Sequence, residues 1–171
     1  MLHIFGDTTL EFPYTYKYIK RLKDDSKPSK RRAFLSVDKP NKSFYELAEK
    51  FGPPSRVMSW CCNIFKTGPI GNLFKQIANE SKLLTYYGVR RSESSSRSKY
   101  DKISQSPKIA KQLVISPIID WHDAEVWLYL LTRGIDFNEA YKFGFRRVGC
   151  WCCPNNSDWS EFLSEIFMPN R

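Results

Sequence analysis

The residues best suited to chemistry in this chain are its five cysteines, which fall into two groups far apart in the sequence. The first group is the adjacent pair Cys61 and Cys62, and the second lies within residues 150–154. Cys150 and Cys153 form a C-x-x-C pattern, whose two thiolates can reach one metal centre from a single turn. With the first pair they supply four thiolates, the number that a [4Fe–4S] cluster or a structural zinc ion requires.

Three interpretations of the cysteines stay open at this point. Adjacent ligands such as Cys61 and Cys62 are unusual for zinc, where a spacer of about two to four residues is typical, and this favours an iron–sulfur cluster. The thiols could also be buried without binding a metal. The fifth thiol, Cys152, is expected to point away from its neighbours and to be packed in the protein.

The composition indicates a globular protein without a membrane segment. Hydrophobic residues make up 42% of the chain, but no apolar run approaches the ~20 residues that a membrane helix needs. Residues 1–12 include an Asp and a Glu, where a signal peptide has basic and then apolar residues. We therefore expect a soluble, cytoplasmic protein. Structural disulfides are not expected there, because the cytosol keeps thiols reduced.

The net charge of +9 predicts attraction for phosphate, sulfate or nucleic acid. One basic cluster lies in residues 20–32, and its part rich in Lys, Ser and Pro, residues 23–32, is expected to be a basic linker loop with a solvated surface. Two smaller clusters lie beside motifs, and these are Arg90, Arg91 and Arg97 in one and Arg146 and Arg147 in the other.

The elements that must position these residues alternate between strands and helices. Strands are expected at residues 2–5, 33–37, 83–89 and 113–119, and helices at 11–22, 43–51, 70–77, 122–132 and 158–167. Ser43 is suited to cap its helix, with Glu46 completing a capping box. This alternation predicts an α/β fold with a mainly parallel sheet, in a single domain over residues 1–171.

The order of several motifs resembles the iron–sulfur branch of the phosphoadenylyl-sulfate (PAPS) reductase family, the adenylyl-sulfate (APS) reductases. A Cys-Cys pair, a long gap and a Cys-x-x-Cys follow one another in both. Residues 7–13, D-T-T-L-E-F-P, are similar to the family's D-T-G-x-E-F-P, with Thr9 in place of the Gly. Residues 88–94 resemble its G-x-R-R-x-x-S element, and residues 116–121, 126–127, Asn138 and Tyr141 match the stretch before the second cysteine pair.

The resemblance implies a doubly wound fold of the adenine nucleotide α-hydrolase type and a [4Fe–4S] cluster held by Cys61, Cys62, Cys150 and Cys153. It also implies a substrate side, formed by Asp7, Thr8, Lys66, Arg90 and Arg91. Arginines suit a sulfated nucleotide because they bind its oxygens by bidentate, charge-assisted bonds. The alternatives are salt bridges of the arginines to Glu93 and nearby acids, a solvated Lys66 and a turn-forming Asp7.

Two elements of the family pattern are absent from the sequence. The first strand with its phosphate loop, S-G-G-x-D-S, does not precede residue 1, and residues 156–171 stand where the family has its tail, E-C-G-x-H. The resemblance therefore implies a truncated domain in which no residue is the catalytic nucleophile.

The resemblance also implies a reaction for the complete enzyme. That enzyme would reduce adenylyl sulfate or its 3′-phosphorylated form to sulfite with thioredoxin or glutathione. The alternatives are a sulfurtransferase of the same superfamily acting on DNA or tRNA, and a non-enzymatic iron–sulfur module.

Overall fold

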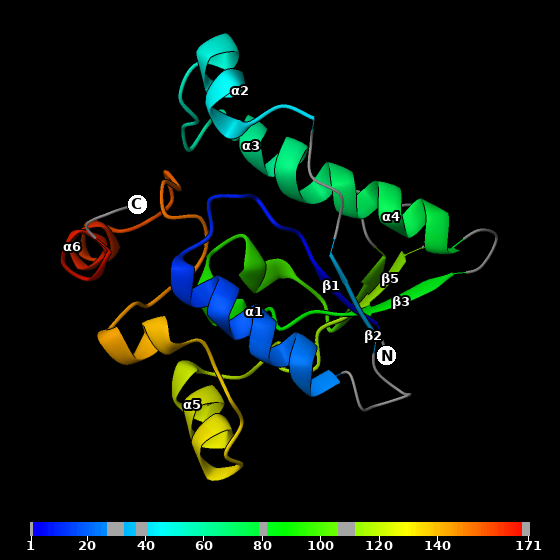
Figure 1. Ribbon diagram of the computed structural model, residues 1–171. Coiled ribbons are helices and arrows are strands. Elements are labelled where there is room, and N and C mark those ends of the chain that lie inside the picture. Colours follow the sequence, from blue (N-terminus) through cyan, green and yellow to red (C-terminus); the bar gives the residue numbers. More distant parts are fainter. Residues whose placement is uncertain (1, 27–32, 37–40, 79–81, 106–111, 169–171) are drawn as a thin grey trace. The chain divides into compact units, whose positions relative to one another are not determined.

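The structure is a computed structural model that describes residues 2–26, 33–36, 41–78, 82–105 and 112–168 (Figure 1). The chain divides into two compact units, unit 1 with Met1–Ile70 and Phe137–Arg171, and unit 2 with Gly71–Asp136. Strands and helices alternate along both, as predicted for the α/β class. No helix within the described residues has the length and apolar character needed to cross a membrane.

Unit 1 begins with a strand–helix–strand motif. Strand β1 (Leu2–Phe5) pairs in parallel with β2 (Ala33–Ser36), and helix α1 (Pro13–Ser26) connects them. The helix starts at Pro13 because a proline ring presets the helical φ and the first turn does not need its missing N–H. Since α1 continues to Ser26, the first residues of the predicted 23–32 linker are helical, and residues 27–32 lie outside the described part.

The middle of unit 1 is helical and leads to the first cysteine pair. Helix α2 (Phe44–Phe51) has the predicted capping box, in which the backbone N–H groups of Glu46 and Ser43 each donate to the other's side chain. After it come α3 (Trp60–Cys62), a π-helical turn η1 (Asn63–Thr67) and α4 (Gly68–Ala78). The sequence predicted a helix at 70–77 but not the π-helical turn before it.

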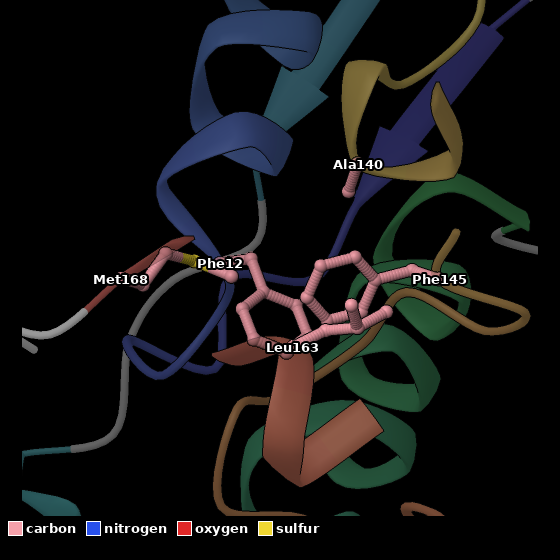
Figure 2. Packing of buried hydrophobic residues seen from close by; sticks show 5 residues of the cluster. All are labelled: Phe12, Ala140, Phe145, Leu163 and Met168. Carbon is pink, nitrogen blue, oxygen red and sulfur yellow. The ribbon is translucent and has the colours of Figure 1, made fainter. Parts of the chain in front are cut away.

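The core of unit 1 joins its two chain segments. The 3₁₀ turn η4 (Glu139–Phe143) and helix α6 (Asp158–Phe167), the latter with the predicted bounds, belong to the second segment. Figure 2 shows the rings of Phe12 and Phe145 together with Leu163, and the two ring centroids are 5.2 Å apart. Burying each phenylalanine contributes about 1.5–3 kcal/mol, which holds the segment before α1 against the segment that leads to Cys150.

Unit 2 contains a three-stranded mixed sheet in the order β3-β5-β4. Strands β3 (Leu83–Tyr86) and β5 (Gln112–Ile115) are parallel, whereas β4 (Ile103–Gln105) pairs antiparallel with β5. The sequence did not predict β4, because a strand of three residues has no apolar run. Unit 2 also contains the part of α4 from Gly71 onward, two 3₁₀ turns, η2 (Arg91–Glu93) and η3 (Arg97–Lys99), and helix α5 (Asp123–Thr132).

Candidate functional site

All five cysteines line a single pocket in unit 1. Each thiol is half-buried, and Thr8, Lys66 and Arg147 line the pocket with them. The structure thus brings together the two cysteine groups that are distant in the sequence. The expectation that Cys152 points away from its neighbours is wrong, because packing of residues 150–156 into a tight loop turns this thiol into the same pocket.

Trp60 anchors the helix that carries the first cysteine pair. Its indole N–H donates to the carbonyl oxygen of Gly52 at 3.1 Å, and its ring stacks on Phe44 with centroids 5.4 Å apart. An indole that buries apolar surface and also has its N–H hydrogen-bonded is held firmly in place. Cys61 and Cys62 follow directly on this fixed residue, so α3 presents both thiols from one rigid turn.

The π-helical turn η1 places Lys66 in the pocket. Such turns, which insert one residue into a helix, occur frequently at functional sites. Here the backbone N–H of Gly68 donates to the carbonyl of Asn63, and Phe65 inside the turn is buried. A Cβ atom on Gly68 would lie 2.7 Å from the Asn63 oxygen, so this turn requires glycine at its end.

A compact loop carries the second cysteine group. The backbone N–H of Cys153 donates to the Cys150 carbonyl at 3.2 Å, which closes the predicted turn of the C-x-x-C. The buried amide of Asn156 donates to the carbonyls of Cys150 and Trp151 at 3.2 and 2.9 Å. The loop is also bound to the first segment, because Glu11 and Cys150 form an antiparallel bridge.

The segment before α1 contributes Thr8 to the pocket, whereas Asp7 holds a turn. Thr8 is buried, and its hydroxyl lies 3.2 Å from the Cys150 sulfur. The Asp7 carboxylate accepts hydrogen bonds from the Thr9 backbone N–H and the Tyr16 hydroxyl, both at 2.8 Å. Thr9 adopts a left-handed conformation with φ of 66°, at the position where the resembled motif has glycine. These contacts match the turn-forming alternative for Asp7.

The environment favours the protonated form of three of the thiols, those of Cys61, Cys150 and Cys152. Burial raises the pKa of Cys150, and Glu11 adds to this, while Thr8 and Lys66 act in the opposite direction. Burial and the neighbouring Cys62 raise the pKa of Cys61. Burial, with Cys150 next in importance, raises the pKa of Cys152 to about 11. A metal bound here would have to displace protons, so its affinity would rise with pH.

Lys66 carries a positive charge beside these thiols. Its burial lowers its pKa, but Cys150, Glu11 and Cys62 raise it, and the net shift is upward. Its ammonium therefore stays charged beside the cysteines. Among the described residues, no group of three His, Cys, Asp or Glu side chains is arranged to hold a metal ion.

Arg90 and Arg91, the other predicted substrate residues, belong to unit 2, where acids of that unit surround them. Arg90 pairs with Glu93 at 3.3 Å and with Asp123. Arg91 pairs with Asp120 and donates to the Tyr100 carbonyl at 3.1 Å. The salt bridges that the sequence left open as an alternative are therefore present, and a role in substrate binding stays a prediction.

Sequence reasoning missed two residues of the site. Glu11 was noted only as a member of the D-T-T-L-E-F-P motif, yet it is 8% exposed and contacts Thr8, Lys66 and Cys150. Arg147 was noted only as part of a basic cluster. It lines the pocket and forms no ion pair with any described residue. A charged residue between two apolar neighbours, Leu10 and Phe12, was the available signal for Glu11.

Comparison with known proteins identifies the family. The model of the phosphoadenosine phosphosulfate reductase domain matches residues 1–156. The chain belongs to this family. An uncharacterized protein of Methanocaldococcus jannaschii is 34% identical over 88% of the chain and 34% of that protein. The adenosine 5′-phosphosulfate reductase of Staphylococcus epidermidis is 28% identical over 88% of the chain and 58% of that enzyme. The chain thus spans less than two thirds of the length of these relatives.

Solved structures show the fold of the family. The crystal structure of phosphoadenylyl-sulfate reductase from Candida auris has a TM-score of 0.66 at 20% identity, over 90% of this chain and 70% of that one. Candida glabrata FMN adenylyltransferase has a TM-score of 0.58 at 16% identity, over 87% of this chain and 40% of that one. These matches confirm the predicted nucleotide α-hydrolase-like α/β fold, and PAPS reductase family membership confirms the resemblance.

Proposed function

We propose that the chain is the part of a sulfonucleotide reductase that holds the iron–sulfur cluster and binds the sulfate group of the substrate. The [4Fe–4S] cluster would be bound by Cys61, Cys62, Cys150 and Cys153. The observation that carries this proposal is the single pocket in which all five thiols lie together with Lys66. Segments from the two ends of unit 1 are folded against each other to form it.

The donor set fits an iron–sulfur cluster by its chemistry, whereas its present geometry does not bring three of the described thiols to metal-binding positions. Four thiolates are the ligands that such a cluster takes from a protein, and hydrogen bonds to their sulfur atoms tune it. The Thr8 hydroxyl lies 3.2 Å from the Cys150 sulfur, but its one proton is donated to Glu11 in this structure, so it is a polar neighbour of this ligand. When bound, the cluster would supply delocalised charge next to the Lys66 ammonium. Cys152 would remain as a fifth, unliganded thiol in the pocket.

The proposed reaction of the complete enzyme is the reduction of adenylyl sulfate, or of its 3′-phosphorylated form, to sulfite and the corresponding adenosine nucleotide. Two electrons would come from two thiols of thioredoxin or glutathione, which become a disulfide. Lys66 would bind the sulfate group. For Arg90 and Arg91 in unit 2, binding of an anionic group of the nucleotide stays a prediction from the family resemblance. We assign no catalytic nucleophile. We place the protein in the cytoplasm, where thiols stay reduced.

Anaerobic purification followed by iron and acid-labile sulfide analysis tests the cluster. Calorimetric titration with adenylyl sulfate and with ATP tests the substrate, and we expect adenylyl sulfate to bind more tightly. Lys66→Gln should weaken adenylyl sulfate binding about tenfold or more, because a charge-assisted contact contributes about 1.5–3 kcal/mol. The matched control is Lys50→Gln on the exposed surface of α2, which should leave binding unchanged. A protein without iron and sulfide would contradict the proposal.

A second function, transfer of sulfur to tRNA or DNA, is favoured by the surface of α1. Lys17, Lys20 and Lys23 are exposed at intervals of three residues on this helix. The Lys17 ammonium also lies 5.3 Å from the centroid of the Tyr14 ring. Nucleic-acid binding through such a face would weaken steeply with salt. Salt-dependent binding of tRNA that is lost in Lys17→Gln/Lys20→Gln, together with a preference for ATP over adenylyl sulfate, would support this function instead.

A further inference from the structure

Among the residues that the structure describes, Glu11 is the one carboxylate in contact with the cysteine site, and the proposed function does not use it. Its side chain is only 6% exposed, which is rare for a glutamate, because burying an ionised carboxylate costs several kcal/mol unless it is paired. It lies at the bridge between the segment before α1 and the Cys150 loop. A buried charge where the segment before α1 meets the Cys150 loop needs a structural or functional explanation.

Three donors converge on one oxygen of this carboxylate. Its Oε1 accepts a hydrogen bond from the Thr8 hydroxyl at 3.0 Å and pairs with the Lys66 ammonium at 3.7 Å. The Cys150 thiol is also 3.7 Å from the same atom. Thr8 in turn lies 3.2 Å from the Cys150 sulfur, so the four side chains form a closed network.

The signs of the charges show what this network can do. A carboxylate repels a thiolate, so Glu11 by itself opposes ionisation of Cys150 and opposes a ligand role for it. Lys66 is the cation of this network and opposes the repulsion, as the Thr8 hydroxyl also does, and its long, flexible side chain is 39% exposed. Without a fixed partner, the ammonium would be free to turn into solvent. Glu11 therefore has a use at this site only through Lys66.

We propose that Glu11 is a positioning residue, whose carboxylate is oriented by Thr8 and holds the Lys66 ammonium against Cys150. The cation is thereby kept beside the cysteine ligands and at the place where an anionic sulfur group would bind. This role rests on the proposed function in that Cys150 is taken to be a ligand and Lys66 a substrate contact. The Glu11–Lys66 pairing itself does not depend on it.

The test compares Glu11→Gln with Glu49→Gln, which removes the same charge from an exposed position on α2. Reductive methylation of the purified protein, followed by peptide mass spectrometry, measures how readily each lysine reacts. In Glu11→Gln the Lys66 ammonium loses its carboxylate partner, so its exposure and the fraction of uncharged amine both rise. Lys66 should therefore be methylated about threefold faster or more, relative to Lys50. Glu49→Gln should leave that ratio unchanged. An unchanged Lys66 rate in Glu11→Gln would overturn the proposal.

Thr8→Val keeps both charges and provides the test if Glu11→Gln does not fold. The loss of the hydroxyl that orients the carboxylate should still accelerate Lys66 methylation, by a smaller factor, and no acceleration would overturn the role. None of these measurements needs a cluster. An absence of iron and sulfide from the wild-type protein would therefore refute the proposed function and leave the result for Glu11 standing.

The midpoint reduction potential of the bound iron–sulfur cluster distinguishes a positioning role of Glu11 from the effect of its charge alone. In a Lys66→Gln background, Glu11→Gln only removes a negative charge, so the potential rises. With Lys66 present, the same substitution also releases the cation, and the rise should be smaller or reversed. Equal shifts in the two backgrounds would mean that Glu11 does not act through Lys66.

Discussion

The two units use charged residues in opposite ways. In unit 2 the arginines Arg90, Arg91 and Arg97 each have a carboxylate of the same unit as partner. In unit 1 Lys66 faces one buried carboxylate, that of Glu11, and several half-buried thiols in a pocket. The three arginines of unit 2 are thus paired within their own unit, whereas the thiols of unit 1 hinder one another's ionisation.

This difference indicates where a ligand is needed. Exposed ion pairs contribute about 0–1 kcal/mol, so they can be replaced with little loss. Titratable groups that are buried together in a pocket, despite the free-energy cost of burying them, are found at functional sites more often than exposed ion pairs are. A cation that binds the thiolates would relieve the repulsion among them. We therefore expect substitutions in the cysteine pocket to have large, specific effects, and substitution of the exposed Arg97 in unit 2 to have a small one.

The largest effect is expected for Cys150→Ser. Loss of one ligand should reduce the iron content of anaerobically purified protein from about four per chain to less than about one. Cys152→Ser is the matched control, because it removes a thiol from the same pocket and should leave the iron content unchanged. If Cys152→Ser lost as much iron as Cys150→Ser, the assignment of the four ligands would be wrong.

A single methyl group at Gly68 should have the next largest effect. Its Cβ would lie 2.7 Å from the Asn63 oxygen, so Gly68→Ala must open the π-helical turn and displace Lys66. We expect a loss of about 2 kcal/mol in the free energy of unfolding, measured with urea. Adenylyl sulfate binding should weaken as well.

The control is Gly71→Ala in the same helix, where an added Cβ has no atom within 4 Å. There the higher helix propensity of alanine should stabilise the protein by up to about 1 kcal/mol. A similar loss of stability in both variants would show that the turn does not depend on Gly68.

Much of the fold could be predicted because its signals are local. The apolar run at residues 2–5, the capping box at Ser43 and the helical periodicity of residues 158–167 each depend on neighbours in the sequence, and all three are present. The π-helical turn and β4 could not be predicted. The first arises from packing of the segment after Cys62, and the second from pairing with β5.

The site was predictable to the extent that residue type alone decides its chemistry. The types and spacing of the cysteines predicted both ligand groups, and the resemblance to the family predicted Lys66 as a site residue. Burial and contacts decided the rest. The inward position of Cys152 and the network around Glu11 depend on the bridge between residues 11 and 150, for which the sequence holds no local signal.

A smaller effect of opposite sign is expected at Thr9. A left-handed conformation costs a residue with a Cβ atom about 1–2 kcal/mol, and glycine avoids this cost while losing more entropy on folding. Thr9→Gly should therefore raise the free energy of unfolding by about 0.5–1 kcal/mol. Thr9→Ala keeps a Cβ atom and should change it little. If both variants gained equally, the φ of 66° would not be the cause.

The smallest effect is expected for Arg97→Gln in unit 2. Its side chain is 44% exposed, and its partner Glu93 already pairs with Arg90, so the substitution leaves no carboxylate without a cation. The loss should be about 0.3 kcal/mol in urea unfolding and smaller still at high salt. Arg90→Gln should cost more, because that side chain is 15% exposed and spans Glu93 and Asp123. A loss above about 1 kcal/mol for Arg97→Gln, or weaker adenylyl sulfate binding, would mean that this loop is not balanced by its own acids. The contrast with the cysteine pocket would then disappear.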